Sequence, residues 1–201
     1  MTIATNKPLT HAKVAKGDVR MIYEGRTWAQ FKALQEGFEN SGVRLSYYDE
    51  TVEILRPGKA HEVFTGIIGF LIETFLFQQG VNFVLTGSMT QENETASAQA
   101  DRSYEIEDRK LSIEINFTSG SLAKLKRYRA LGIDEVWIWN DGVLEIYQLL
   151  LSGYQKVERS AIPALSELDL DVMQACILVG ETSTLEAGKK LLAAHSNEQT
   201  A

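Results

Sequence analysis

Two hydrophobic periods alternate along the chain, and they predict a fold built from both strands and helices. Apolar residues at every second position indicate strands, and apolar residues three and four positions apart indicate helices. The pattern predicts strands at residues 43–48, 51–55, 81–86, 101–106, 110–117, 135–139, 143–149 and 154–158. It predicts helices at residues 28–40, 59–79 and 120–131, one within 165–179, and a terminal one at 182–194. This order predicts an α/β or α+β fold with a mixed β-sheet flanked by helices.

Turn residues set several of these boundaries. Thr27 can cap the first helix, and Gly80 can end the long apolar one. Asp49-Glu50 and Asp141-Gly142 each separate two alternating segments, so each predicts a β-hairpin. Residues 91–99 are polar and predict a loop.

The composition is that of one domain with a hydrophobic core. Of the 201 residues, 44% are hydrophobic and 23% are charged, so global disorder is not expected. We expect a flexible N-terminal tail at 1–18, a single domain at 19–180 and a C-terminal helix or tail at 181–201. No signal peptide is visible, and the apolar stretch at 63–77 is too short and too polar to span a membrane. We therefore expect a cytoplasmic protein without membrane association.

Cysteine content and charge narrow the function classes. Cys176 is the single cysteine, which excludes an intramolecular disulfide and a multi-cysteine zinc site within one chain. Its apolar neighbours predict a small buried residue rather than a nucleophile. The net charge of −7 argues against a nonspecific nucleic-acid coat, which would be basic. A nuclease remains compatible, because acids around a metal ion lower the net charge while a local basic face meets phosphates.

Two acids lie on neighbouring predicted strands. Asp101 opens one strand, and Glu114 lies within the next, where Ser112 and Asn116 share its face. Asp101 could be an ordinary turn residue, and the face that carries Glu114 could be solvated. The alternative is a polar face that lines a cleft, where the two acids hold a divalent metal that activates water.

The helix that follows offers a cation. Lys124 lies near its start, where a lysine opposes the helix dipole unless an anion compensates, although a solvated lysine is equally compatible. Leu125, Tyr128 and Leu131 are expected on the inner face of the helix. The outer face is expected to carry the basic residues Lys126, Arg127 and Arg129.

His61-Glu62 begins the long apolar helix. Glu62 in the first turn is favoured by the dipole, and it could also point over the cleft as a further ligand. His61 is expected at the surface or as a cap, because no second histidine follows four residues later. The sequence contains no P-loop, Gly-x-Gly-x-x-Gly or Gly-x-Ser-x-Gly motif, which argues against nucleotide binding and serine hydrolysis.

Taken in order, these residues resemble the Uma2 family, also catalogued as DUF820, a family of putative restriction endonucleases common in cyanobacteria. The resemblance covers residues 27–179. It rests on His61-Glu62, Gly87-Ser88, Asp101, Tyr104, Ile113-Glu114-Ile115, Phe117-Thr-Ser-Gly, Lys124-Leu125, Tyr128 and Leu131-Gly-Ile-Asp-Glu-Val-Trp-Ile-Trp.

The resemblance implies a restriction-endonuclease-like core of the PD-(D/E)xK superfamily and a metal-dependent endonuclease that hydrolyses DNA. Asp101, Glu114 and Glu62 match metal ligands for Mg²⁺ or Mn²⁺, with Lys124 as the catalytic lysine. Tyr128 and Asn116 would support the site. Contacts with the DNA backbone are expected from Lys126, Arg127 and Arg129.

Three positions depart from the superfamily pattern. Asn116 stands where the motif lysine would fall, so the resemblance assigns that role to Lys124. Ala100 replaces the usual proline, and Gln99 stands where related sequences often carry an acid. The alternative is therefore a weak or inactive nuclease fold that serves as a dimeric binding module. A homodimer is expected in either case, since two-fold symmetry is common and suits the cutting of both strands of a duplex.

Overall fold

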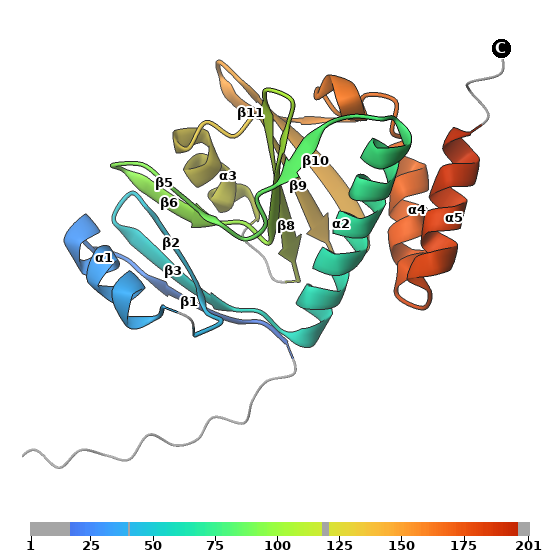
Figure 1. Cartoon of the computed structure of the whole chain (residues 1–201). Helices are drawn as coiled ribbons and strands as arrows, with labels where there is room; N and C mark the ends of the chain where they lie inside the picture. Colours follow the sequence, from blue (N-terminus) through green and yellow to red (C-terminus); the bar gives the residue numbers. More distant parts are fainter. Residues whose placement is uncertain (1–16, 40, 118–120, 197–201) are drawn as a thin grey trace, which may run out of the picture.

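The computed structural model describes residues 17–39, 41–117 and 121–196, and these form two sheets with helices around them. Figure 1 shows the smaller sheet with α1 beside it, and the larger sheet with α2, α4 and α5 on its other side. The helices are α1 (Trp28–Gly37), α2 (Lys59–Gln78), α3 (Ser121–Ala130), α4 (Leu170–Gly180) and α5 (Thr184–His195). A short 3₁₀ helix spans Pro163–Leu165. The fold is mixed α and β, consistent with a restriction-endonuclease-like core.

The smaller sheet has five strands in the order β1-β3-β2-β6-β5, and neighbouring strands are antiparallel. Its members are β1 (Val19–Tyr23), β2 (Arg44–Tyr48), β3 (Thr51–Arg56), β5 (Thr90–Glu92) and β6 (Ala96–Gln99). Asp49 and Glu50 both have positive φ, which is the conformation that a tight two-residue hairpin requires. Phe31 of α1 is buried against this sheet in a cluster with Tyr47 and Val52.

The larger sheet has six strands in the order β11-β10-β9-β8-β7-β4. Its members are β4 (Phe83–Leu85), β7 (Arg102–Ile106), β8 (Arg109–Asn116), β9 (Glu135–Asn140), β10 (Val143–Leu150) and β11 (Gly153–Val157). Strands β8 and β9 run parallel, with α3 as their connection, and the other pairings are antiparallel. The sheet is therefore mixed, as predicted.

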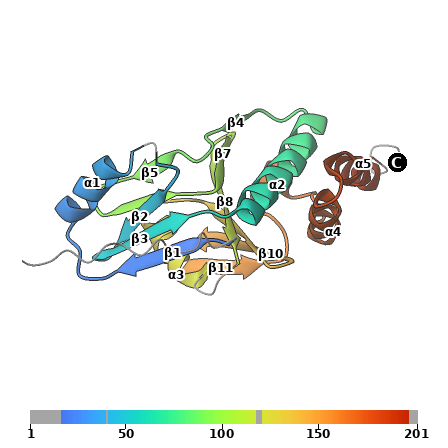
Figure 2. The same cartoon turned by 90° about the horizontal axis from the view of Figure 1, so that it is seen from below.

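The two faces of the larger sheet are covered differently. Helix α2 packs on β8 and carries α4 and α5 on its outer side, as Figure 2 shows from below. Helix α3 lies on the opposite face, where it contacts β9 and β11 of the larger sheet and β2 and β6 of the smaller one. Because successive residues of a strand point to opposite faces, β8 sends alternate side chains into two different environments.

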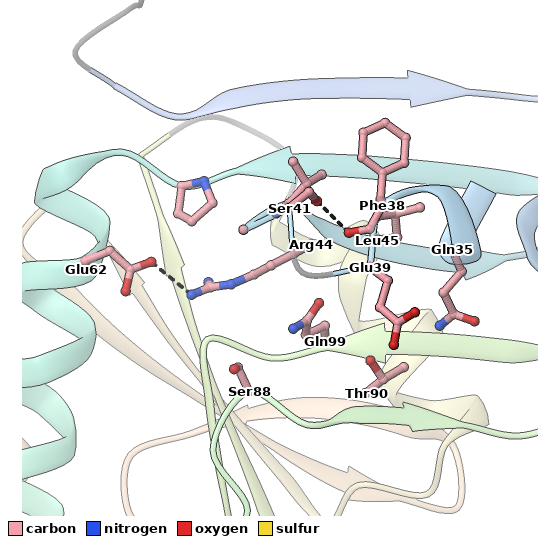
Figure 3. A pocket seen from close by; sticks show the side chains of 13 residues that line it. Gln35, Phe38, Glu39, Ser41, Arg44, Leu45, Glu62, Ser88, Thr90 and Gln99 are labelled. Carbon is pink, nitrogen blue, oxygen red and sulfur yellow. Dashed lines mark hydrogen bonds and ion pairs between the residues drawn. The ribbon is translucent and has the colours of Figure 1, made fainter.

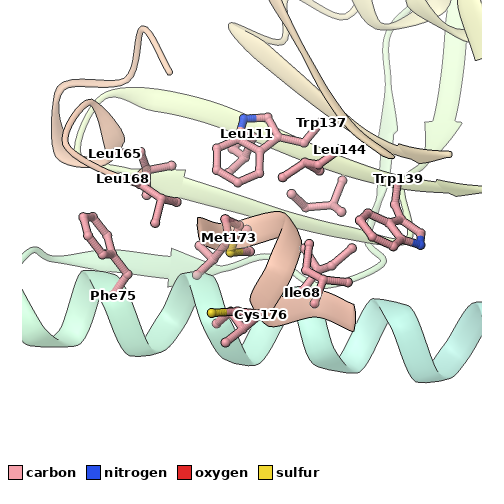
Figure 4. Close-up of a cluster of buried hydrophobic side chains, with 14 of the residues drawn as sticks. Ile68, Phe75, Leu111, Trp137, Trp139, Leu144, Leu165, Leu168, Met173 and Cys176 are labelled. Atoms are coloured by element: carbon pink, nitrogen blue, oxygen red, sulfur yellow. The ribbon is translucent and has the colours of Figure 1, made fainter. Parts of the chain in front are cut away.

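The main hydrophobic core fills the space between the larger sheet and α2, α4 and α5. Figure 4 shows its centre, where Leu111 and Trp137 from the sheet meet Met173 and Cys176 from α4. Cys176 is fully buried, as predicted. The apolar alternation of β8 has placed Leu111, Ile113 and Ile115 in this core.

Helix α2 has the length and composition of a membrane span, with a mean hydropathy of 1.4, and half of that stretch is buried inside the protein. A single helix of this kind is a weak indication of a span, because the core helix of a soluble protein has the same properties.

The structure corrects the predicted elements in two places. Residues 91–99 are not a loop, because β5 and β6 form there; β6 is made of small residues that lie buried beneath α3. Strand β1 was not predicted, and it pairs with β3 at the edge of the smaller sheet. The Thr27 cap and both predicted hairpins are confirmed. Residue 120, where the helix at 120–131 was predicted to begin, lies outside the described residues.

Candidate functional site

Asp101 is fixed to the strand that carries Glu114. It directly precedes β7, and its backbone N–H donates to the carbonyl of Ile113 at 3.1 Å. Its Oδ2 accepts the backbone N–H of Ile115 at 2.5 Å, and its side chain is only 1% exposed. These two hydrogen bonds, one from the backbone and one to the carboxylate, hold Asp101 against β8 on either side of Glu114.

Glu114 is buried and held by two residues of α3. Lys124 Nζ donates to Glu114 Oε2 at 2.5 Å, and the Tyr128 hydroxyl donates to Oε1. Residues four positions apart on a helix share one face, so α3 presents both donors to the same carboxylate. Ser112 and Asn116 lie on the same side of β8 and are also buried, so this face is not solvated.

The charges around Glu114 keep it ionised. Burial alone would raise the pKa of Glu114, but the positive charges of Lys124 and Arg127 and the two hydrogen bonds outweigh it, so the pKa lies below its ordinary value. Burial raises the pKa of Tyr128 well above its ordinary value, and the Glu114 charge adds to this. Tyr128 therefore stays a hydrogen-bond donor at neutral pH.

Arg127 does not lie on the outer face of α3, which corrects the sequence-based placement. Its side chain is buried, and Nη1 contacts Glu53 Oε2 of β3 at 3.3 Å. Glu53 Oε1 also accepts from Arg20 Nε at 2.7 Å. The reason is that α3 contacts strands of both sheets. Of Lys126, Arg127 and Arg129, only Lys126 and Arg129 are exposed. Arg127 is therefore not available on the surface as a contact for DNA.

His61 is fully buried, which corrects its expected place at the surface. Its Nδ1 lies 3.0 Å from Asp18 Oδ2, and its Nε2 lies 2.7 Å from Asp101 Oδ1. Asp18 Oδ1 also accepts the backbone N–H of Gly58, the N-cap residue of α2. Burial lowers the pKa of His61, and this outweighs the effect of Asp18.

Arg44 joins Glu62 to Asp101. Arg44 Nη2 donates to Glu62 Oε1 at 3.0 Å, while Nη1 contacts Asp101 Oδ1 and lies 3.1 Å from His61 Nε2. Glu62 is 56% exposed, and it reaches Asp101 only through this guanidinium. Figure 3 shows Arg44 and Glu62 at the wall of a pocket of about 450 Å³, which Gln99 and Ser88 also line.

The residues present fit an oxygen-preferring divalent cation held by few protein ligands. Asp101 Oδ1 is buried beside Arg44 Nη1 and lies 2.7 Å from His61 Nε2. Among the described residues, it accepts no well-aligned hydrogen bond. An oxygen that faces the Arg44 cation in this way could bind a metal ion in its place, and Mg²⁺ commonly uses one or two carboxylates while retaining waters. Within residues 17–39, 41–117 and 121–196, no group of three or more His, Cys, Asp or Glu is arranged to hold a metal ion.

Three residues of this constellation were not found from the sequence. Arg44 and Glu53 lie at the polar positions of the two predicted hairpin strands, which predicts solvent exposure, whereas Glu53 is buried and the Arg44 side chain is 11% exposed. Asp18 lies in what was expected to be a tail, and no local pattern distinguishes it. By contrast, the structure brings Glu114, Lys124 and Tyr128 into direct contact, as the sequence suggested.

The comparisons with known proteins agree with this architecture. The family model described as Uma2, putative restriction endonuclease, matches residues 28–175, a range that contains Asp101, Glu114 and Lys124. No curated protein matches the chain. Because the family model covers well over half of the sequence, this chain belongs to the Uma2 family.

Proposed function

We propose that this protein is a divalent-metal-dependent endonuclease that hydrolyses phosphodiester bonds in DNA. The observation that carries the proposal is the buried contact of Glu114 with Lys124 and Tyr128, beside the Asp101 carboxylate from the preceding strand. Family membership supports a nuclease, and buried acids paired with a lysine have no structural need at this place, since apolar residues would fill it at lower cost.

The proposed roles follow from the position of each side chain. Asp101 and Glu114 would hold Mg²⁺ or Mn²⁺, which when bound supplies Lewis-acid activation of water and of the scissile phosphate. Tyr128 and Lys124 fix the Glu114 carboxylate. Lys124 also brings positive charge to the place where the attacked phosphoryl group gains negative charge, and it orients the attacking water. Glu62 acts through Arg44, which it holds at the edge of the site.

DNA would approach along the exposed side of α3. Lys126 and Arg129 are exposed there, and they are proposed to contact phosphates. A homodimer would bring two sites to the two strands of a duplex. The homodimer is tested by measuring the molar mass of the protein in solution by light scattering, with and without a DNA duplex.

A second candidate function is a binding module with the nuclease fold, and one specific observation favours it. Both carboxylates already have cationic partners within the protein, since Arg44 contacts Asp101 and Lys124 contacts Glu114. Asn116 also stands at the superfamily's usual lysine position. Such a module would bind DNA without metal and without cleaving it.

A cleavage assay distinguishes these two functions. Supercoiled plasmid and linear DNA are incubated with the protein in Mn²⁺, in Mg²⁺ and in EDTA. We expect metal-dependent nicking that Asp101→Asn and Glu114→Gln abolish, with circular dichroism to confirm that each variant is folded. Glu135→Gln is the matched control, because Glu135 is also a buried glutamate but lies at the start of β9, where it bonds Trp137 rather than a residue of α3. Cleavage that survives Asp101→Asn, or binding without cleavage in either metal, would overturn the proposal.

A further inference from the structure

Two electron-pair donors converge on one point beside the proposed site. His61 Nε2 and Asp101 Oδ1 lie 2.7 Å apart, both side chains are essentially buried, and Oδ1 makes no hydrogen bond of acceptable geometry within the described part of the chain. If Nε2 carries no proton, both atoms are electron-pair donors and need a positive group against them. In this structure that group is Arg44, whose Nη1 contacts Oδ1 and lies 3.1 Å from Nε2.

The neighbours of His61 select one form of the ring. Asp18 is an acceptor 3.0 Å from Nδ1, so Nδ1 carries the proton. Arg44 is a donor facing Nε2, so Nε2 presents its lone pair. A carboxylate that fixes the protonated nitrogen while the other nitrogen faces outward is the arrangement by which proteins orient a metal-binding histidine. Asp18 is itself held by the Gly58 N–H at the start of α2, so the ring orientation is fixed by the fold.

We propose that His61 is a metal ligand through Nε2, next to Asp101 Oδ1, and that Arg44 occupies the cation position when no metal is bound. This inference rests on the proposed function and extends it, because it adds a nitrogen ligand beside the Asp101 carboxylate. Imidazole favours transition metals over Mg²⁺, whereas carboxylates and water serve both. The site should therefore prefer Mn²⁺ to Mg²⁺.

Arg44 could move into a neighbouring pocket when a metal binds. Its other nitrogen, Nη2, already donates to Glu62, which is 56% exposed, and both residues line the pocket of about 450 Å³ in Figure 3. A small movement into that pocket would keep the Glu62 contact and release Asp101 and His61. Arg44 therefore competes with the metal for Asp101 and His61. Its hydrogen bond with Glu62 keeps it close to both residues.

The direct test is pulsed electron paramagnetic resonance of Mn²⁺ bound to the full chain. Coordinated histidine nitrogen couples to the Mn²⁺ electron spin, and the coupling changes when histidine is labelled with ¹⁵N. We expect this coupling in the wild type and its loss in His61→Gln. His195→Gln is the matched control, because His195 is also buried and hydrogen-bonded but lies in α5 beside α4. Its coupling should equal that of the wild type.

Titration with Mn²⁺ alone separates failure of this inference from failure of the proposed function. If the wild type binds no Mn²⁺, both are overturned. If Mn²⁺ binds and is lost in Glu114→Gln, but no nitrogen coupling appears or the coupling survives in His61→Gln, only the role of His61 is overturned. Asp18→Asn keeps the His61 ring and removes its orienting carboxylate, so it should weaken Mn²⁺ binding by about 10–100-fold. An unchanged affinity in that variant would contradict the proposed orientation.

The proposed role of Arg44 predicts that its replacement raises the affinity for Mn²⁺. Arg44→Met removes the competing charge while keeping a long side chain, so Mn²⁺ should bind on the order of tenfold more tightly. Arg20→Met is the control, because Arg20 pairs with Glu53 rather than with Asp101. Weaker or unchanged Mn²⁺ binding in Arg44→Met would show that Arg44 does not occupy the metal position.

Discussion

Two buried glutamates on neighbouring strands show how this fold treats charge in different ways at its two sheet faces. Glu114 of β8 points toward α3 and is held by Lys124, with Arg127 close by. Glu135 of β9 instead accepts from the neutral donors Trp137 Nε1, Ser160 Oγ and the Ala161 N–H. Burial raises the pKa of Glu135, and the neutral donors only partly offset it, whereas the pKa of Glu114 is lowered.

This comparison indicates which of the two glutamates has a purely structural role. Neutral hydrogen bonds are enough to anchor the start of β9 to residues 160–161. A lysine, an arginine and a tyrosine around Glu114 exceed what anchoring requires, and buried ion pairs seldom stabilise a fold more than apolar residues of similar volume would. Glu135 therefore has the surroundings of a structural residue, and Glu114 those of a residue kept for chemistry.

Breaking the charged pair should have the largest effect on stability. Lys124→Met leaves the Glu114 carboxylate without its direct cation, so the free energy of unfolding should fall by about 3–5 kcal/mol at neutral pH. The measurement is urea unfolding followed by circular dichroism. The double variant Glu114→Leu with Lys124→Met should recover most of that loss. A double variant as unstable as the single one would show that the pair itself stabilises the fold.

Removing the charge of Glu135 should cost less. Glu135→Gln keeps an oxygen for Trp137 and Ser160 but turns an N–H group toward the Ala161 N–H, so one buried donor loses its acceptor. We expect the free energy of unfolding to fall by about 1–3 kcal/mol. Differential scanning calorimetry of this variant beside Lys124→Met checks the order. A larger loss in Glu135→Gln would reverse the assignment of the two roles.

The two glutamates should also respond to pH in opposite directions. The folded pKa of Glu114 is lowered, so the stability it contributes is present above the unfolded pKa and is lost as the pH falls through the folded one. The folded pKa of Glu135 is raised above 4.5, so its contribution is full at lower pH and declines as the pH rises through the folded pKa.

This prediction is checked by urea unfolding between pH 4 and pH 8. The difference in free energy of unfolding between the wild type and Glu135→Gln should become smaller as the pH rises, because only the wild type loses a proton there. A difference that does not depend on pH would show that Glu135 has its ordinary pKa in the folded protein.

The sequence correctly predicted the elements that depend on residues close together in the chain. The Asp49-Glu50 and Asp141-Gly142 hairpins depend on turn residues, and the alternation in β8 assigns Ile113 and Glu114 to opposite faces. Strand β6 was missed because its sequence Ala-Ser-Ala-Gln lacks the β-branched and aromatic residues typical of strands; the small Ala98 fits there because α3 packs against it.

Long-range pairs account for the parts of the site that could not be predicted. Arg127 is buried because Glu53 lies opposite it, 74 positions away in the sequence. His61 is buried where three separate segments meet, with Asp18 against Nδ1 and with Arg44 and Asp101 beside Nε2. Helical spacing alone could place Lys124 and Tyr128 on one face, but it could not show that α3 is covered by protein on its other sides as well.

The smallest effect on stability is expected from replacing an exposed basic residue of α3. This variant distinguishes the exposed basic residues of α3 from its buried ones. Lys126→Ala removes a solvated side chain, so the free energy of unfolding should change by no more than about 0.5 kcal/mol. If Lys126 contacts a phosphate, the variant should bind duplex DNA more weakly for every sequence, and the slope of log affinity against log salt should decrease by about 1. Fluorescence anisotropy at several salt concentrations measures this, with Lys189→Ala, an exposed lysine of α5, as the control. An equal salt slope in the wild type and Lys126→Ala would exclude that contact and would move the DNA-binding face away from α3.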